Sequence, residues 1–207
     1  MNSIKTTLSF LLLLILFFPS FSVYGQSFEE QLVFHHITDR QGLSQRTVRA
    51  ILQDSEGFIW LGTQDGLNKY DSYNMTVYRL DLQNPNSLPF DEIRAIFEDS
   101  RGNLWFGGWG LSRYNREKDH FYHYNYDYLE EADELWRVDT AINSLGEDDQ
   151  GNLLIGSDNG LAVLDIDKNV LAYQYADASR GDTLSHPRIT EIFKDSKGNV
   201  WIGTRNG

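Results

Sequence analysis

The sequence predicts an all-β fold that is built from repeated four-stranded antiparallel units, and three observations support this prediction. A short phrase occurs four times, and the aspartates that mark its copies are 45, 49 and 47 residues apart: Asp54, Asp99, Asp148 and Asp195. Short apolar runs alternate with turns that contain Asp and Gly in each copy, as in antiparallel strands that are joined by tight turns. No long helical periodicity is present, which excludes a helical solenoid.

Each copy of the phrase has an Asp and a Gly in a turn, a bulky apolar residue in the following strand, and a second Gly shortly after. The four sets are Asp54, Gly57, Trp60 and Gly62; Asp99, Gly102, Trp105 and Gly107; Asp148, Gly151, Leu154 and Gly156; and Asp195, Gly198, Trp201 and Gly203. The Asp accepts hydrogen bonds from turn amides, and the first Gly tolerates positive φ. Because Leu154 replaces Trp in one copy, the position requires an apolar core side chain rather than a stacking platform. We interpret all four sets as structural.

The first unit contains four strand-like runs, at Val48–Gln53, Phe58–Gly62, Leu67–Tyr70 and Met75–Leu80. Four antiparallel strands in a repeat of this length are typical of a β-propeller blade. A β-sandwich is the structural alternative, but it gives no reason for one phrase to recur at a nearly constant period.

The repeat also sets the expected boundaries along the chain. We expect blades at about 48–80, 93–126 and 142–175, and a half-blade at 189–207. The segment 32–37 precedes the first blade as a fourth strand precedes the next, so we expect an N-terminal strand that closes the propeller. Because about 4 to 8 blades close a propeller, we expect residues 26–207 to be an incomplete propeller whose partners include the remaining blades of a longer parent chain.

Residues 1–25 have the pattern of a signal peptide. Lys5 precedes an apolar run at Leu8–Phe18, and small residues stand before a cleavage position at Gln26. The run is shorter than the roughly 20 residues of a spanning helix, so we predict export, with an uncleaved signal anchor as the alternative. The absence of cysteine excludes a lipoprotein anchor, disulfides and thiol nucleophiles.

The charge balance argues against one class of partner. Eighteen Lys and Arg residues face 30 Asp and Glu residues, for a net charge of −12. A nucleic-acid-binding surface needs concentrated basic residues, so no nucleic acid contact is expected from this region.

The phrase from Gly42 to Asp71 resembles the two-component regulator propeller repeat, and the in-phase copies extend the resemblance over nearly all of residues 30–207. The resemblance implies the periplasmic sensor region of a hybrid two-component histidine kinase from a Bacteroides-like bacterium. It further implies a membrane-anchored, homodimeric parent at the inner membrane, and an oligosaccharide ligand. The kinase residues of such a parent are not in this chain, so no catalytic residue is expected here.

A ligand of a propeller usually binds at one end of its central channel, where the loops between second and third strands and between blades meet. Loop residues of variable chemistry are the candidates: Arg46, Gln64, Asp65, Trp109, Trp136, Arg137, Asp158, Asn159, His186, Arg188 and Arg205. Aromatic faces suit the C–H surfaces of sugars, and planar donors suit their hydroxyl and carboxylate groups.

No cofactor or metal is expected. His120 and His123 lie in a predicted strand, where residues three apart point to opposite faces. The run Asp165-x-Asp167-x-Asn169 lacks the glycine and the final acid of a calcium loop.

Two classes of function remain after these exclusions. The first is the sensing module described above. The alternative is an exported propeller enzyme, such as a polysaccharide lyase, or a free carbohydrate-binding propeller.

Overall fold

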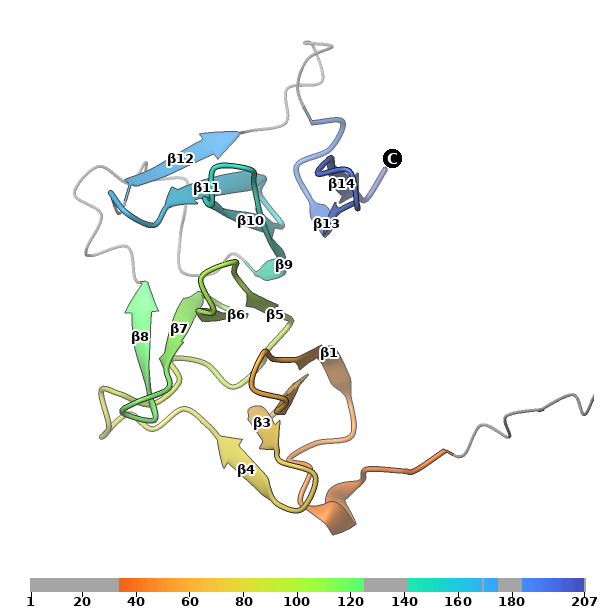
Figure 1. Cartoon of the computed structure of the whole chain (residues 1–207), viewed down its shortest axis with the longest axis vertical. Coiled ribbons are helices and arrows are strands. Elements are labelled where there is room, and N and C mark those ends of the chain that lie inside the picture. The colour runs from red at the N-terminus through yellow and green to blue at the C-terminus, as the bar shows by residue number, and fades with distance from the viewer. Residues whose placement is uncertain (1–33, 125–140, 169, 175–183, 207) are drawn as a thin grey trace, which may run out of the picture. The chain divides into compact units, whose positions relative to one another are not determined.

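The computed structural model describes residues 34–124, 141–168, 170–174 and 184–206 (Figure 1). Within these residues there are fourteen strands and one short 3-10 helix, η1 (Asp39–Gln41), all in a compact unit formed by Ile37–Gly207. The predicted signal peptide, residues 1–25, lies outside the described residues. Those residues include no apolar helix of membrane-spanning length.

Three four-stranded sheets and one hairpin follow one another along the chain, and each joins its strands in sequence order. The first sheet consists of β1 (Val48–Gln53), β2 (Ile59–Thr63), β3 (Leu67–Tyr70) and β4 (Met75–Tyr78). The second consists of β5 (Ala95–Glu98), β6 (Leu104–Gly107), β7 (Leu111–Asn115) and β8 (His120–Tyr124). The third consists of β9 (Ile142–Glu147), β10 (Leu153–Ser157), β11 (Leu161–Asp165) and β12 (Val170–Gln174). The hairpin consists of β13 (Ile189–Lys194) and β14 (Val200–Thr204).

All of these strand pairs are antiparallel. The predicted all-β fold of four-stranded antiparallel blades is therefore confirmed.

The strand expected at 32–37 does not form over residues 34–37, which have no regular secondary structure. An extended segment becomes a strand only when its backbone groups pair with a neighbouring strand, and no described strand pairs with this segment. Residues 32 and 33 lie outside the described part of the chain, and the role of this segment in closing the propeller stays a prediction.

The repeated Asp does more than shape its turn. Asp54 Oδ1 accepts from the backbone N–H groups of Glu56 and Phe58 at 3.1 and 2.9 Å, while its Oδ2 accepts from the indole Nε1 of Trp60 at 2.8 Å. The indole bond recurs between Trp105 and Asp99 at 2.8 Å. The turn is thereby tied to the core of its own sheet, a link that the sequence pattern did not reveal.

The third copy has no tryptophan to make this bond. Asp148 Oδ2 accepts instead from Asn152 Nδ2 at 2.8 Å, and Leu154 fills the apolar position. The carboxylate is therefore satisfied by local groups whether or not an indole is present.

The second Gly of the first three phrases lies where the next sheet begins. A Cβ at Gly62 would be 2.8 Å from Ile93 Cγ2, and one at Gly107 would be 2.6 Å from Ile142 Cγ2. Real Cβ atoms do not approach other atoms this closely. Glycine is therefore needed at both positions for Ile93 and Ile142 to pack against them.

Ion pairs also link neighbouring sheets. Arg116, in the β7–β8 turn, pairs with Glu56, in the β1–β2 turn of the first sheet, at 3.0 Å. Arg101, in the β5–β6 turn, pairs with Asp167, in the β11–β12 turn of the third sheet, at 2.6 Å. The anion therefore belongs to the earlier sheet in the first pair and to the later sheet in the second.

Trp201 differs in exposure from the equivalent tryptophans. Trp60 and Trp105 are fully buried, whereas Trp201 is 62% exposed. Trp60 packs against Phe106 of the following sheet with ring centroids 5.4 Å apart. Among the described residues no third strand joins β14 and no further sheet packs on the hairpin, so the core role of Trp201 stays a prediction.

Candidate functional site

Four of the predicted loop residues lie together where the third sheet meets the hairpin. Arg188 Nε lies 3.1 Å from Asp158 Oδ1. His186 Nδ1 accepts from the backbone N–H of Arg188 at 3.0 Å, and the Arg205 N–H donates to the carbonyl of Arg188 at 3.0 Å. Local backbone bonds thus position the Arg188 guanidinium beside a carboxylate.

Asn143, at the start of β9, extends this cluster. Its Nδ2 donates to Asp158 Oδ1 at 2.8 Å and to the carbonyl of Ile189 at 3.0 Å. Its Oδ1 lies 3.4 Å from Arg94 NH1 of the second sheet. A single amide therefore connects the second sheet, the third sheet and the hairpin.

Arg94 positions the predicted aromatic residue of the site. Its guanidinium carbon lies 5.2 Å from the ring centroid of Trp109, which is 43% exposed. Arg94 NH2 pairs with Glu92 at 3.0 Å, and Arg49 of β1 pairs with the same carboxylate at 3.4 Å. Within the described residues Arg94 Nε is buried without a hydrogen-bond partner, so it is a donor that a ligand or water can satisfy.

Together these side chains form a line across the three four-stranded sheets and the hairpin. We call this line the loop-face network: Arg49, Glu92, Arg94, Trp109, Asn143, Asp158 and Arg188. Four of its members were not predicted as site residues: Arg49, Glu92, Arg94 and Asn143. A usable signal was present, because Arg49, Arg94, Asn143 and Thr190 each follow the apolar residue that opens a repeat. The copies differ at this position while the surrounding scaffold residues recur.

The other predicted residues are not joined to the network by the ion pairs that the structure shows. Arg46 pairs with Asp39 at 2.9 Å, and Asp65 pairs with Arg79 at 3.1 Å. Gln64 is exposed, and the backbone N–H of Asn159 donates to Ser157 Oγ at 3.1 Å. Trp136 and Arg137 lie outside the described residues, and their place in the site stays a prediction.

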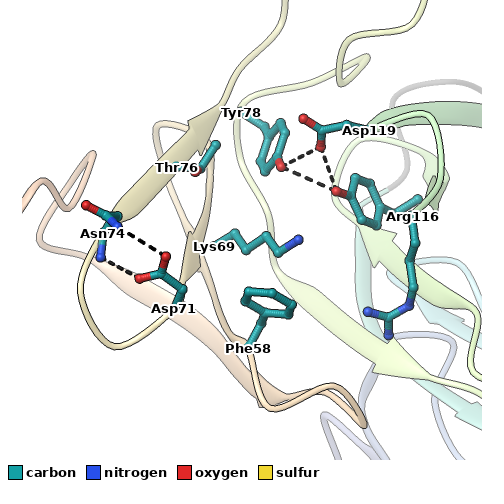
Figure 2. A pocket seen from close by; sticks show the side chains of 9 residues that line it. Phe58, Lys69, Asp71, Asn74, Thr76, Tyr78, Arg116 and Asp119 are labelled. Carbon is teal, nitrogen blue, oxygen red and sulfur yellow. Dashed lines mark hydrogen bonds between the residues drawn. The ribbon is translucent and has the colours of Figure 1, made fainter.

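A separate cavity of about 300 Å³ lies between the first sheet and the β7–β8 hairpin (Figure 2). Its lining comes from both sheets: Phe58, Lys69, Asp71, Asn74, Thr76, Tyr78, Tyr114, Arg116 and Asp119. None of these residues was predicted as a site residue, since the prediction was confined to loops at the other end of the strands. We refer to this cavity as the inter-blade pocket.

Two tyrosines and one carboxylate connect the walls of the inter-blade pocket. The hydroxyls of Tyr78 and Tyr114 both donate to Asp119 Oδ1 at 2.6 Å. Burial and the hydrogen bond to Asp119 raise the pKa of Tyr114 to about 12 and also raise the pKa of Tyr78. Burial opposes ionisation of Asp119, but the two tyrosine bonds outweigh it and lower the pKa of this carboxyl. At neutral pH the tyrosines are therefore donors and Asp119 is an anion.

Among the residues that the structure describes, no three His, Cys, Asp or Glu side chains gather as a metal site would require.

The successive four-stranded antiparallel sheets, each joined in sequence order, define the described residues as blades of a β-propeller. The family model described as "Two component regulator propeller" matches residues 42–65, 87–110 and 183–206. The chain therefore carries three segments that match this propeller repeat.

Solved structures of the extracellular domain of BT4673 from B. thetaiotaomicron are similar to this chain. One, described as a putative one component system, has a TM-score of 0.68 at 27% identity and covers 85% of this chain and 23% of its own. The other, described as a putative hybrid two component system, has a TM-score of 0.64 at 28% identity and covers 80% and 21%.

Two further proteins extend the comparison. "Histidine kinase P4" of Formosa agariphila is 34% identical over 74 residues, which are 36% of this chain and 5% of that protein. Virginiamycin B lyase from Staphylococcus aureus has a TM-score of 0.54 at 16% identity, covering 77% of this chain and 49% of its own, which shows the fold alone. The chain spans less than a quarter of the histidine kinase and of the BT4673 domains.

Proposed function

We propose that this chain forms part of the ligand-sensing propeller of an exported two-component signalling protein, and that its ligand is an oligosaccharide. The parent would be a homodimeric histidine kinase anchored in the inner membrane, with this region on the periplasmic face. The similarity to extracellular domains of BT4673 and to a histidine kinase supports this assignment. The region itself binds and does not catalyse.

The observation that carries the proposal is the loop-face network. It presents the exposed ring of Trp109, which Arg94 supports from one side, beside the Asp158–Arg188 pair. An aromatic face binds the C–H surface of a sugar ring, while guanidinium, amide and carboxylate groups bind its hydroxyls. Because the network crosses four sheets, it suits a ligand of several linked rings better than a single compact one.

Isothermal titration calorimetry of the intact protein with a panel of oligosaccharides tests this site. We expect Trp109→Ala and Arg188→Ala each to weaken the binding of the responding sugar about tenfold, which is roughly 1.4 kcal/mol. Leu82→Ala is the matched control, because Leu82 is exposed and lies outside the network. Equal affinities for the wild type and both network variants would refute the assignment of the loop-face site.

A further inference from the structure

The inter-blade pocket is distinct from the loop-face network. The pocket is lined by the β1–β2, β3–β4 and β7–β8 turns and the strand ends beside them. The network residues lie at the opposite strand ends, near the loops that connect β6 to β7 and β10 to β11. In an antiparallel sheet these two sets of turns lie at opposite ends of the strands. A ligand in the pocket would therefore not compete directly with one on the network.

Lys69 gives the pocket an available positive charge. Its ammonium lies 4.0 Å from the centroid of Phe58 and 5.5 Å from that of Tyr114, between aromatic walls. In Figure 2 its side chain extends into the space between Phe58 and Tyr78. Among the described residues no carboxylate lies within ion-pair distance of Lys69, although its charge helps to lower the pKa of Asp119 on the same pocket. The aromatic rings stabilise this cation without neutralising it.

Arg116, the second cation of the pocket, is already neutralised. It pairs with Asp54 at 2.9 Å, with Glu56 at 3.0 Å and with Glu98 at 2.8 Å. Its guanidinium therefore maintains the contact between the first and second sheets. An anion that enters the pocket has Lys69 as its cationic partner.

Asp119 supplies an acceptor on the same cavity. Its backbone has a φ of 52°, a left-handed conformation that Asp tolerates better than most residues. Both tyrosine hydroxyls donate to Oδ1, and no described residue forms a hydrogen bond with Oδ2. This second oxygen is oriented by the turn and free to accept from a hydroxyl group of a ligand.

We propose that the inter-blade pocket binds a small ring acid that carries hydroxyl groups, with its carboxylate on Lys69 and a hydroxyl on Asp119. The walls formed by Phe58, Tyr78 and Tyr114 contact the apolar face of the ring. A volume of about 300 Å³ is at the lower end for small-molecule sites, which suits one ring rather than a chain. The carboxylates of Asp71 and Asp119 disfavour a dianion such as phosphate.

This proposal does not rest on the loop-face network, so either binding site can be refuted without refuting the other. Saturation-transfer NMR and calorimetry of the intact protein would use D-glucuronate as the probe, with D-glucose as the same ring without the carboxylate. We expect glucuronate to bind in the millimolar range or tighter and glucose at least tenfold more weakly. Trp109→Ala should leave glucuronate binding unchanged.

The matched variants are Lys69→Met and Lys118→Met. Lys69→Met keeps an unbranched chain beside Phe58 and removes the charge, so we expect glucuronate binding to weaken at least tenfold. Lys118 is exposed in the β7–β8 turn, and Lys118→Met should bind as the wild type does. Comparing glucuronate with its methyl ester on the wild-type protein removes the same charge from the ligand, which keeps the test valid if Lys69→Met does not fold.

Several results would overturn the proposal. These are no glucuronate binding by the wild-type protein, equal binding of glucuronate, its methyl ester and glucose, or unchanged binding by folded Lys69→Met. Binding of a zwitterion such as L-phenylalanine in preference to glucuronate would assign the pocket to amino acids and would equally refute a hydroxylated acid.

Discussion

At the scale of single residues, Asp54 connects three parts of the structure. It accepts from its turn amides, from the Trp60 indole at 2.8 Å and from Arg116 NH1 of the second sheet at 2.9 Å. Burial alone would raise the pKa of Asp54, but the bonds from Trp60 and Arg116 outweigh it and lower the pKa. The ionised carboxylate therefore stabilises the folded state.

This lowered pKa predicts a loss of stability in acid. An Asp in an unfolded chain titrates near pH 3.9, so the stabilisation from Asp54 is fully present above about pH 4. It is lost as the pH falls through the lower folded-state pKa. We expect Asp54→Asn to lower the free energy of unfolding by about 1–3 kcal/mol at neutral pH and to flatten its acid dependence. Urea denaturation at a series of pH values would measure both effects, with the exposed Glu117→Gln as control. An identical acid dependence in Asp54→Asn and wild type would contradict this.

The equivalent tryptophans predict unequal losses. Trp105 is fully buried, whereas Trp201 is 62% exposed. We expect Trp105→Ala to cost roughly 3–5 kcal/mol, as for other large-to-small changes in a core, and Trp201→Ala to cost much less. Chemical denaturation of both variants in this 207-residue chain would compare them. Equal losses would show that Trp201 is covered in solution.

At the scale of strands and turns, glycine sets the approach of one sheet to the next. A Cβ at Gly107 would meet Ile142 Cγ2 at 2.6 Å, and the shortest contact of one at Gly110, in the adjoining β6–β7 turn, would be 3.4 Å. We expect Gly107→Ala to lower the free energy of unfolding by about 1–3 kcal/mol through overpacking. Gly110→Ala should change it little, and thermal melts would separate the two. Rescue of Gly107→Ala by Ile142→Ala would confirm the contact, and an unchanged melting temperature in Gly107→Ala would rule it out.

Turn hydrogen bonds repeat at the same scale. Ser55 Oγ donates to Glu98 Oε1 at 2.6 Å, and Ser100 Oγ donates to Glu147 Oε1 at 2.8 Å. Each turn serine thus binds the last residue of the first strand of the following sheet. These bonds fix the register between neighbouring sheets as the glycine contacts fix their spacing.

At the scale of the whole molecule, the sequence predicts the blades better than it predicts the sites. Strand runs, turn aspartates and glycines are local features, and their recurrence was enough to identify the fold. The contact of Arg94 with Asn143 joins two different repeats, and so does that of Tyr78 with Asp119. Such contacts depend on how far one sheet is rotated and shifted against the next, which the spacing of the repeats does not specify.

The same limit explains which predicted site residues came together. Asp158 and Arg188 lie on adjacent loops and form an ion pair. Arg46 and Asp65 form ion pairs with Asp39 and Arg79 instead. Loop position alone therefore groups residues at one end of the blades but does not identify which of them face one another. Arg49, Arg94 and Asn143 were missed because they lie at the starts of strands.

The opposite polarity of the Arg116–Glu56 and Arg101–Asp167 pairs bears on how a chain of similar units assembles correctly. If the first sheet packed directly against the third, Glu56 would face Asp167, and two copies of the second sheet would bring Arg101 against Arg116. Both arrangements place like charges together, whereas the native order places opposite charges 3.0 and 2.6 Å apart. Tandem repeats are prone to mispairing between equivalent units. We therefore expect repulsion between like charges to disfavour packing that skips a blade or that exchanges blades between two chains during folding.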